Sequence, residues 1–480
     1  MAISLKKAAV FQFAAKYYNY LLQIVLTIVL ARLIGPDEFG LVAIVTVFLN
    51  LFFLLSDCGL SPAIVRYQEL DNKDHNALFT FSGVIGIALS LLFLGVSPVI
   101  SFFYQRDELT PLLTLSAISI LFNSLNMVPN GILIKEKRFD LLSMRLVIVS
   151  SLTGFITVGL AFFGFGVYAL VLQTLLNSML VFVWNYMMTP IKFGEWRFVK
   201  QVKKVFKYST YQFLYNLISF FSGNLPNMVL GKAMDPYRLG LYDRAFRLSS
   251  YPAQALGGVA GSVLQPYLRD LDSKRQELYL AYIRLQKILV LIGAPISVFL
   301  LFSAREIILI MYGPNWVDAA IPFALLSISV VFKISNCTIG PLLQSTGDTE
   351  YLFREGVIAT AITAIFLCVG VVTNELSLVA LCVSLAYVLH TVPCIYYTIH
   401  KVFNQPVAKY VRLFAPEALA CLLYCVAIYG FIQLGASRLG TVIWFLLKIV
   451  ALALVFCVVY FICHQFTYFS KNDKKGKQCH

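Results

Sequence analysis

Long apolar stretches recur along nearly the whole chain, and short polar segments separate them. A membrane-spanning helix needs about 20 mostly apolar residues, and fourteen stretches reach roughly that length. They lie at about 8–33, 41–64, 77–103, 111–133, 144–164, 167–188, 207–231, 241–268, 280–302, 319–345, 352–373, 376–400, 409–433 and 440–467. The period-2 alternation of barrel strands is absent, and backbone in lipid must bond internally. The pattern therefore predicts α-helices.

Composition agrees with a chain that lies mainly in lipid. Of its 480 residues 59% are apolar and only 13% are charged, about half the usual globular share. We therefore expect an all-α integral membrane protein with about 14 transmembrane helices. Its net charge of +14 would raise the question of nucleic acid in a soluble protein, so the positions of the basic residues decide what it means.

The basic residues are divided unequally between the two sides of the predicted helices. If the N-terminus is cytoplasmic, 27 of the 38 Lys and Arg residues fall on the cytoplasmic side and eight on the other. Lys16, Lys333 and Lys448 lie within spans. Basic loops stay in the cytoplasm, so we expect both termini there and no nucleic-acid partner. Lys448 lies near the end of its span and is expected to snorkel towards water.

Cysteine, histidine and known catalytic motifs give no sign of an enzyme. Nine of the ten cysteines fall in spans and none is in a CxxC pair, and the five histidines lack metal-ligand spacing. We read these cysteines as small buried apolar residues and expect no metal and no cofactor. Walker A, GxSxG and HExxH motifs are absent. The short outer loops leave no room for a catalytic domain.

The chain matches itself at an offset of 200 residues. Residues 7–42 share eight identities with 207–242, including Pro36 with Pro236 and Gly40 with Gly240. A second match, at a similar offset, relates the last part of the fourth span to the last part of the tenth. The matched segments start at Asn126 and Asn336. Helices 1–6 and 7–12 are therefore expected to be two six-helix lobes related by a parallel repeat. The expected domains are the N-lobe at 1–188, a cytoplasmic interfacial linker at 189–206, the C-lobe at 207–401, helices 13 and 14 at 402–468, and a basic tail at 469–480.

Polar residues form a stripe along the first span and a comparable one along the seventh. The first contains Gln12, Lys16, Asn19, Gln23 and Thr27, and the second includes Asn216, Ser219 and Asn227. Lipid does not accept such stripes. They either bond neighbouring helices to each other or line a wet cavity. Recurrence on the repeat-related helix favours the cavity, with Asn19 and Asn216 as lining residues.

Ionisable residues within spans are the next candidates. Lys16 and Asp57 lie at equal depth on neighbouring spans, so they could form a static ion pair, or Asp57 could be a titratable coupling site. Lys333 falls near the middle of its span, where a charge is expensive. It is expected to face a cavity or an anion, and a structural ion pair is the alternative.

Two further groups stay open between a functional and a structural interpretation. Arg244 and Arg247 lie three residues apart at an outer turn. They would form an anion site at the mouth of the cavity, or a solvated turn neutralised by Asp235 and Asp243. His390, near the middle of its span, is either a neutral hydrogen-bonded histidine or a proton-coupling residue.

Four short segments resemble a known family. They are ARLIGPDEFG at 31–40, SDCGL at 56–60, LGLYDRA at 239–245 and MYGPNW at 311–316. Together they resemble Wzx-type polysaccharide repeat-unit flippases of the multidrug/oligosaccharidyl-lipid/polysaccharide superfamily, in particular the colanic-acid-exporter-like branch. The resemblance extends to about residue 400. Asp57 and Arg244 match the acid and the base of two of these motifs, whereas Lys16 and Lys333 are added from their predicted burial.

The resemblance implies a flippase of the bacterial inner membrane. It would carry undecaprenyl-pyrophosphate-linked oligosaccharide repeat units across the bilayer by alternating access, for capsule, O-antigen or exopolysaccharide synthesis. The pyrophosphate would be held by Lys16, Arg244, Arg247 and Lys333. A proton or sodium gradient acting at Asp57 or His390 would drive it, and a polysaccharide polymerase with its chain-length machinery would be its partners. The alternatives are a cation-coupled drug exporter on the same fold and, less favoured, a membrane glycan polymerase or ligase.

Overall fold

The computed structural model describes residues 5–57, 60–67, 69–194, 199–270, 275–346, 348–433, 443–454 and 456. Every regular element in these ranges is a helix. The chain divides into two compact units, residues 1–243 and 244–480. The boundary falls inside one helix, α9 (Pro236–Asp270). The predicted tail at 469–480 lies outside the described residues.

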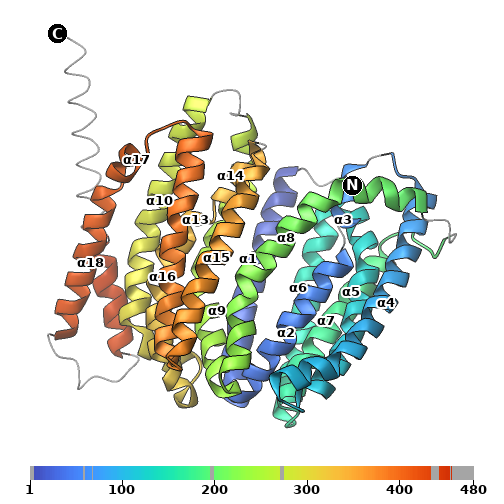
Figure 1. Cartoon of the computed structure of the whole chain (residues 1–480), viewed down its shortest axis with the longest axis horizontal. Coiled ribbons are helices and arrows are strands. Elements are labelled where there is room, and N and C mark those ends of the chain that lie inside the picture. Colours follow the sequence, from blue (N-terminus) through green and yellow to red (C-terminus); the bar gives the residue numbers. More distant parts are fainter. Residues whose placement is uncertain are drawn as a thin grey trace. The chain divides into compact units, whose positions relative to one another are not determined.

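The first unit contains eight helices and the start of α9. They are α1 (Leu5–Leu33), α2 (Pro36–Asp57), α3 (Leu60–Arg66), α4 (Asn72–Tyr104), α5 (Leu109–Lys135), α6 (Phe139–Phe162), α7 (Val167–Met187) and α8 (Val199–Ala233). Helix α5 is central, because it packs against α2, α3, α4 and α7. Figure 1 shows α4, α5 and α7 side by side, in cyan and green-blue. The apolar interior near α3 contains Leu60, Ile64 and Phe79, none of which is exposed.

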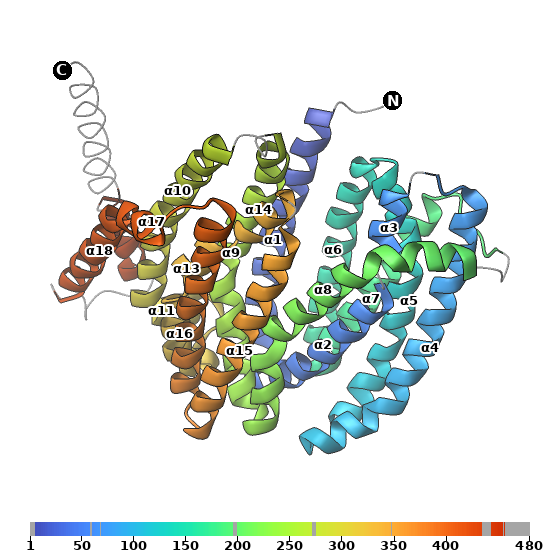
Figure 2. The same ribbon diagram turned by 45° about the horizontal axis from the view of Figure 1, so that its top comes forward.

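The second unit contains the rest of α9 and a shorter set of helices. They are α10 (Arg275–Phe302), α11 (Ala304–Met311), the 3-10 helix η1 (Pro314–Ala319), α12 (Ala320–Ser327), α13 (Val330–Asn336), α14 (Ile339–Ser345), α15 (Thr349–Val372), α16 (Leu376–Ile395), the π-helix η2 (Tyr396–Val402), α17 (Val407–Leu413) and α18 (Ala415–Gln433). An additional apolar helix covers Ile443–Leu454. Helix α10 packs against α12, α13 and α18, and α15 packs against α16 (Figure 2).

The prediction of an all-α multi-pass membrane protein is confirmed. Helix is present at each of the fourteen predicted stretches, the last of which is described only in part. Nine described helices are long and apolar enough to cross a membrane, or eleven if each of two bent pairs is a single span. Helices α8 and α9 are not among them, because they contain more polar and basic residues than these nine.

The tenth predicted span is broken, and this break positions a candidate residue. The helices Pro314–Ser327 and Val330–Ser345 meet at 50°. At the break the hydroxyls of Ser327 and Ser329 donate to Phe323 O and Leu326 O, each over 2.7 Å, and such back-bonding serines bend helices. Farther on, Pro341 cannot donate to the carbonyl four residues earlier. The short helix α13, which contains Lys333, lies between these two interruptions.

The predicted repeat has a counterpart in the packing of each unit. In the first unit α5 packs against α4 and α7; in the second, α12 and α13 pack against α10 and α16. The two matched asparagines do the same thing in their own units. Asn126 accepts a 2.7 Å hydrogen bond from Asn185 of α7, and Asn336 donates a 3.1 Å bond to Thr391 of α16. Each asparagine therefore bonds its span to the one two places further along.

Candidate functional site

Lys333 is the most unusual cation of the second unit. Its Nζ lies 3.5 Å from the hydroxyls of both Ser249 and Ser250. It also lies over two aromatic rings, 4.3 Å from the centroid of Phe246 and 4.5 Å from that of Tyr387. The alternative of a structural ion pair is not observed, because in the described part of the chain no carboxylate lies within 4.0 Å of this amine.

The surroundings of Lys333 stabilise a cation without neutralising it. A desolvated cation over an aromatic ring gains about 2 kcal/mol, which offsets part of the ~2.5–3.5 kcal/mol needed to place a lysine in the middle of a span. Two hydroxyls and two rings supply no negative charge. The hydroxyls of Ser249 and Ser250 now donate to Phe246 O over 2.9 and 2.8 Å and accept from Lys333. The arrangement can therefore bind an anion through the ammonium group, and a serine hydroxyl that rotated away from Phe246 O could also donate to it.

Arg244 and Arg247 precede the serines on the same helix, α9. Both side chains are half-buried, and the helix places them on one face as predicted. The alternative was a solvated turn neutralised by Asp235 and Asp243, and these two acids differ in exposure. Asp235 is exposed and pairs with Arg238 over 3.5 Å. Asp243 is only 1% exposed and accepts a 2.9 Å hydrogen bond from Asn227, so this acid is not solvated.

The proposed pair of Lys16 and Asp57 does not form. Lys16 is exposed, and no carboxylate in the described part of the chain lies within 4.0 Å of it. The pair was predicted because both residues lie at the same depth in the membrane. Depth does not determine the direction in which each side chain points from its helix. Asp57 ends α2 with a buried Oδ1 that makes no hydrogen bond. Asn19 has a buried Oδ1 without a bond as well, and Asn216 is half-buried on α8.

Arg145 is a further cation inside a helix; in the sequence it is one of the 27 basic residues on the cytoplasmic side, at the start of the predicted span 144–164. Helix α6 starts at Phe139, so Arg145 lies six residues inside it, about 9 Å from its start at 1.5 Å per residue. Its guanidinium donates to Asn130 Oδ1 over 3.0 Å, and no described carboxylate lies within 4.0 Å. The position of Arg145 inside a helix could have been recognised from the sequence, because the predicted span 144–164 begins one residue before it.

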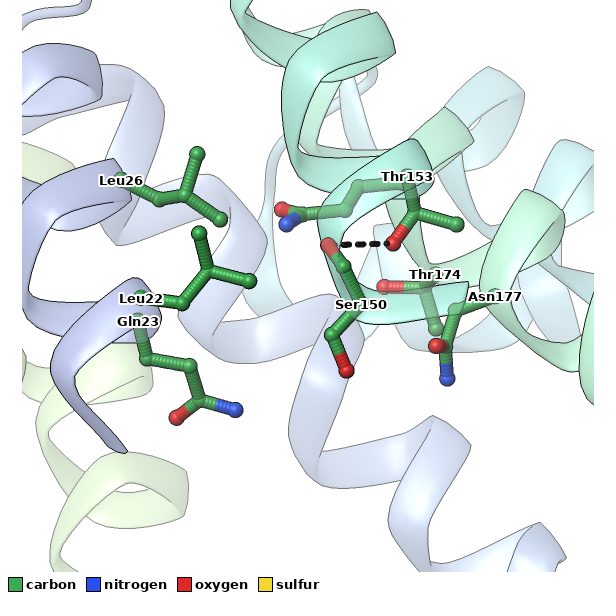
Figure 3. Close-up of a pocket in the computed structure, with 8 residues that line it drawn as sticks. Leu22, Gln23, Leu26, Ser150, Thr153, Thr174 and Asn177 are labelled. Carbon is green, nitrogen blue, oxygen red and sulfur yellow. Dashed lines mark hydrogen bonds between the residues drawn. The ribbon is translucent and has the colours of Figure 1, made fainter. Parts of the chain in front are cut away.

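A polar cavity of about 230 Å³ opens in the first unit between α1, α6 and α7 (Figure 3). Its lining consists of Leu22, Gln23 and Leu26 on one side and Ser150, Thr153, Gln173, Thr174 and Asn177 on the other. Gln23 belongs to the predicted polar stripe, so this part of the stripe faces a cavity. The lining carries amides and hydroxyls but no charge. Such groups both donate and accept hydrogen bonds, as sugar hydroxyls require.

A second cavity of the first unit is almost entirely apolar. It measures about 610 Å³ and is bordered by α2, α4 and α8. Its lining includes Phe48, Phe103 and Met228, with Lys232 as its one charged lining residue. This lining suits hydrocarbon rather than carbohydrate.

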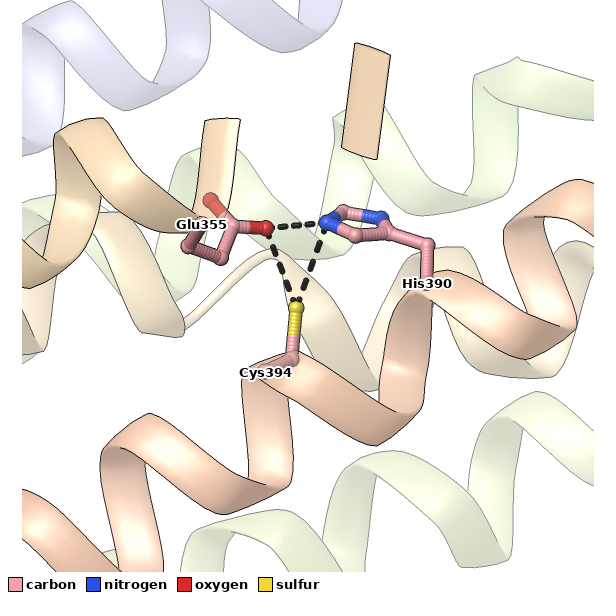
Figure 4. A group of neighbouring side chains, drawn as sticks. All are labelled: Glu355, His390 and Cys394. Atoms are coloured by element: carbon pink, nitrogen blue, oxygen red, sulfur yellow. Dashed lines mark hydrogen bonds and ion pairs between the residues drawn. The ribbon is translucent and has the colours of Figure 1, made fainter. Parts of the chain in front are cut away.

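His390 lies in a cluster that the sequence analysis did not identify. Its Nε2 is hydrogen-bonded to Glu355 Oε1 and lies 3.4 Å from Cys394 Sγ, which itself donates to the same carboxylate oxygen over 3.1 Å (Figure 4). Glu355 comes from α15, and the other two come from α16. Glu355 and Cys394 are buried. The acid was missed because it lies 35 residues before the histidine.

Lys448 does not snorkel, contrary to the sequence prediction. Only 3% of its side chain is exposed, and its Nζ is 2.8 Å from both Glu306 Oε1 and Phe302 O. The position of Lys448 near the end of its span suggested that its amine reaches water. Its partner acid, Glu306, could not be foreseen because it lies 142 residues earlier in the chain. Of the two within-span lysines of this unit, Lys448 is therefore neutralised and Lys333 is not.

These features define a multi-pass α-helical membrane protein with polar and cationic groups inside its helical units. The chain belongs to the family described as "Polysaccharide biosynthesis protein", whose model matches residues 29–321. The family resemblance noted in the sequence is thereby confirmed.

Relatives and solved structures agree with this assignment. The chain is 24% identical to the succinoglycan biosynthesis transport protein ExoT of Rhizobium meliloti, over 74% of this chain and 72% of the relative. It is 22% identical to the lipopolysaccharide biosynthesis protein WzxC of Escherichia coli, over 69% of this chain and 68% of the relative. Its fold is similar to that of the lipid II flippase MurJ in an inward closed conformation, with a TM-score of 0.77, 16% identity and coverage of 96% and 100%. Its fold is also similar to that of an inward-facing multidrug resistance transporter of the MATE family, with a TM-score of 0.61 and 17% identity. This match covers 82% of this chain and 96% of the transporter.

Proposed function

We propose that this protein is a flippase that moves undecaprenyl-pyrophosphate-linked oligosaccharide repeat units across the inner membrane by alternating access. The flipped units would serve capsule, O-antigen or exopolysaccharide synthesis. Family membership supports polysaccharide synthesis, and the names of two relatives refer to polysaccharide transport and lipopolysaccharide synthesis. The observation that carries the proposal is Lys333, a cation inside an apolar helical unit with two hydroxyls beside it and no described carboxylate within 4.0 Å.

A pyrophosphate complements this lysine in charge and in hydrogen bonding. Bonds between an ammonium group and phosphate oxygens are about twice as strong as neutral ones, and they strengthen where water is excluded. Ser249 and Ser250 would donate to the same oxygens once their hydroxyls rotate away from Phe246 O, to which they now donate. Arg244 and Arg247, about one helical turn earlier on α9, extend the basic character of this helix. A cation-coupled drug exporter would instead need carboxylates around its cationic cargo, and no described carboxylate lies within 4.0 Å of the Lys333 amine.

The glycan and the lipid have separate candidate sites in the first unit. The uncharged polar cavity at Gln23, Gln173 and Asn177 would bind sugar hydroxyls. The apolar cavity between α2, α4 and α8 would accept part of a hydrocarbon chain. Asn19, whose amide oxygen is buried without a bond, and Asn216 would line the glycan path.

A gradient of protons or sodium ions would drive the cycle, with Asp57 as the coupling residue. A proton or a sodium ion would satisfy the buried Oδ1, which makes no hydrogen bond. His390 suits this role less well, since Glu355 and Cys394 already occupy its Nε2. Both termini would be cytoplasmic, and a polymerase with its chain-length machinery would take over the flipped units. Catalysis is not part of the proposal.

Surface display of a cognate glycan tests the proposal. Cells that lack their own flippase but make the lipid-linked repeat unit are complemented with the wild-type chain, with the double variant Lys333→Met and Arg244→Ala, or with Lys192→Met in an exposed loop. We expect wild-type and Lys192→Met to display the glycan and the double variant to fail at equal protein level. Full display by the double variant would refute the anion site. Restored drug resistance without glycan display would favour the exporter.

A further inference from the structure

We propose that Glu355, His390 and Cys394 bind a divalent transition-metal ion of the zinc type. Glu355 Oε1, His390 Nε2 and Cys394 Sγ all lie within 4.8 Å of one another. All three belong to the second unit, and the inference does not depend on the transported substrate. The spacing of cysteine and histidine in the sequence predicts no metal, and a bound ion at this cluster would make that prediction wrong.

The donor atoms already have nearly the spacing that a metal ion requires. With Zn–S bonds of about 2.3 Å and Zn–N or Zn–O bonds of about 2.0 Å, tetrahedral geometry separates the sulfur from each other donor by about 3.5 Å. Sγ lies 3.1 Å from Glu355 Oε1 and 3.4 Å from His390 Nε2. Only the directly bonded pair of Glu355 and His390 has to open, to about 3.3 Å. The ion would then replace the hydrogen bonds that now join the three groups.

Backbone geometry holds two of the ligands on one face. His390 and Cys394 are four residues apart on α16, so their side chains point in the same direction. Figure 4 shows Glu355 facing both of them from α15. Pro393 lies between the two α16 ligands, and a π-helix begins two residues after Cys394, at Tyr396. Departures from α-helical geometry of this kind often mark functional sites.

The choice of donors selects the class of ion. Sodium, magnesium and calcium prefer oxygen ligands, whereas a thiolate and an imidazole suit zinc and its transition-metal neighbours. A doubly charged ion with one thiolate, one carboxylate and a neutral imidazole has no net charge, which favours it in an apolar bundle. No Lys or Arg within the described ranges lies within 4.0 Å of Glu355 to compete for it. Three protein ligands leave a fourth position for water or another ligand.

The metal would join α15 to α16 close to the candidate anion site. On α16, Tyr387, whose ring lies beneath Lys333, is three residues before His390, and Thr391, which accepts from Asn336 of α13, is the next residue. Occupancy would therefore stabilise the helix against which α13 packs. We expect the ion to fix the position of α16 rather than to take part in a reaction.

Metal content of the purified full chain tests the proposal. The protein is prepared in detergent without a polyhistidine tag, stripped with a chelator, and titrated with Zn²⁺ or Co²⁺. Elemental analysis gives the stoichiometry, and the Co²⁺ spectrum reports tetrahedral geometry and a thiolate-to-cobalt band. The variants are Cys394→Ser and Glu355→Gln. The controls are Cys368→Ser, an exposed cysteine of α15, and Cys479→Ser in the tail.

We expect one ion per chain, with the thiolate-to-cobalt band present in wild-type and in both controls. Cys394→Ser should abolish that band, and Glu355→Gln should weaken Co²⁺ affinity at least tenfold. Glu355→Gln keeps the size of the side chain, so it remains informative if the serine variant does not fold. Absence of stoichiometric metal, or a band that survives in Cys394→Ser or depends on Cys479, would overturn the proposal. In that case the cluster is a hydrogen-bonded Glu–His–Cys group.

Discussion

Gly40 lies directly against the backbone of Pro236, and Gly240 lies in the same way against Pro36. A Cβ atom at position 40 would be 1.9 Å from Pro236 O, and one at position 240 would be 1.9 Å from Pro36 O. These four residues form two of the eight identical pairs that the 200-residue offset matches. The starts of α2 and α9 therefore meet through a reciprocal contact, as expected for two turns related by a local two-fold axis. This contact gives a physical reason for the recurrence of proline and glycine at both turns.

Replacing either glycine should destabilise the protein. Both positions are helical, so alanine would otherwise be favoured, but its Cβ meets a carbonyl oxygen rather than a flexible side chain. We expect Gly40→Ala and Gly240→Ala each to lower the free energy of unfolding by about 1–3 kcal/mol or more, the usual range for overpacking. Thermal unfolding in detergent, followed by size-exclusion chromatography, measures the shift.

Gly95→Ala is the matched control. Gly95 lies in the interior of α4, and a Cβ atom added there would meet nothing within 4 Å, so alanine should stabilise the helix by about 0.5–1 kcal/mol. Equal melting temperatures for Gly40→Ala, Gly240→Ala and wild-type would show that the close contact between the turns is not a feature of the native fold.

Removing one member of the buried pair of Lys448 and Glu306 should be more harmful than removing both. Lys448→Met leaves the Glu306 carboxylate without its 2.8 Å partner, and breaking such pairs typically lowers stability by about 3–5 kcal/mol. Lys448→Met combined with Glu306→Leu should recover most of the loss. The four melting temperatures form a double-mutant cycle, and additive effects of the two substitutions would contradict a direct pair.

The class of fold was readable from the sequence because span length and apolarity are local properties. Which side chains meet was less readable. Depth placed Lys16 and Asp57 level with each other, but it did not fix the direction of either side chain, and the two do not pair. The spacing of His390 and Cys394 was visible in the sequence. Glu355 joins them only because α15 packs on α16, and that contact is tertiary.

The same limit applies to the neutralisation of the within-span lysines. Lys333 and Lys448 look alike in sequence, as single lysines in apolar runs. Their difference arises from Glu306, which lies 142 residues before Lys448, and from the aromatic residues that α9 and α16 bring to Lys333. Burial could be predicted from the pattern, whereas the partner could not.

The polar cavity predicts a graded effect of its hydroxyls and amides on transport. Thr174→Val removes one lining hydroxyl without changing shape, and a lost hydrogen bond of about 0.5–1.5 kcal/mol corresponds to a roughly 2- to 12-fold weaker affinity for the glycan. Asn177→Leu, which removes an amide, should have the larger effect. Uptake of a fluorescent lipid-linked oligosaccharide in proteoliposomes gives the apparent affinity.

Thr157→Val serves as the control for the cavity. Its hydroxyl is buried in α6 and donates to Thr153 O over 2.7 Å, and the residue does not line the cavity. We expect little change in apparent affinity. A similar loss in Thr157→Val and Thr174→Val would indicate a general effect of the bundle and would count against glycan binding in this cavity.

Lys333 should be a residue whose removal stabilises the protein and abolishes its function. It has no carboxylate partner within 4.0 Å in the described part of the chain, so Lys333→Met removes a charge that is expensive in an apolar bundle. The substitution loses the cation–π contacts with Phe246 and Tyr387 and replaces them with apolar and sulfur–aromatic contacts. We expect an equal or higher melting temperature, together with at least tenfold less glycan on the surface. Lys333→Arg should keep part of the activity, because the charge remains while its geometry changes. Lys448→Met should show the opposite sign in the melting experiment, because it breaks a pair. If Lys333→Met lowered the melting temperature as much as Lys448→Met does, the lysine would have a structural anion partner, and its role in binding the substrate would be refuted.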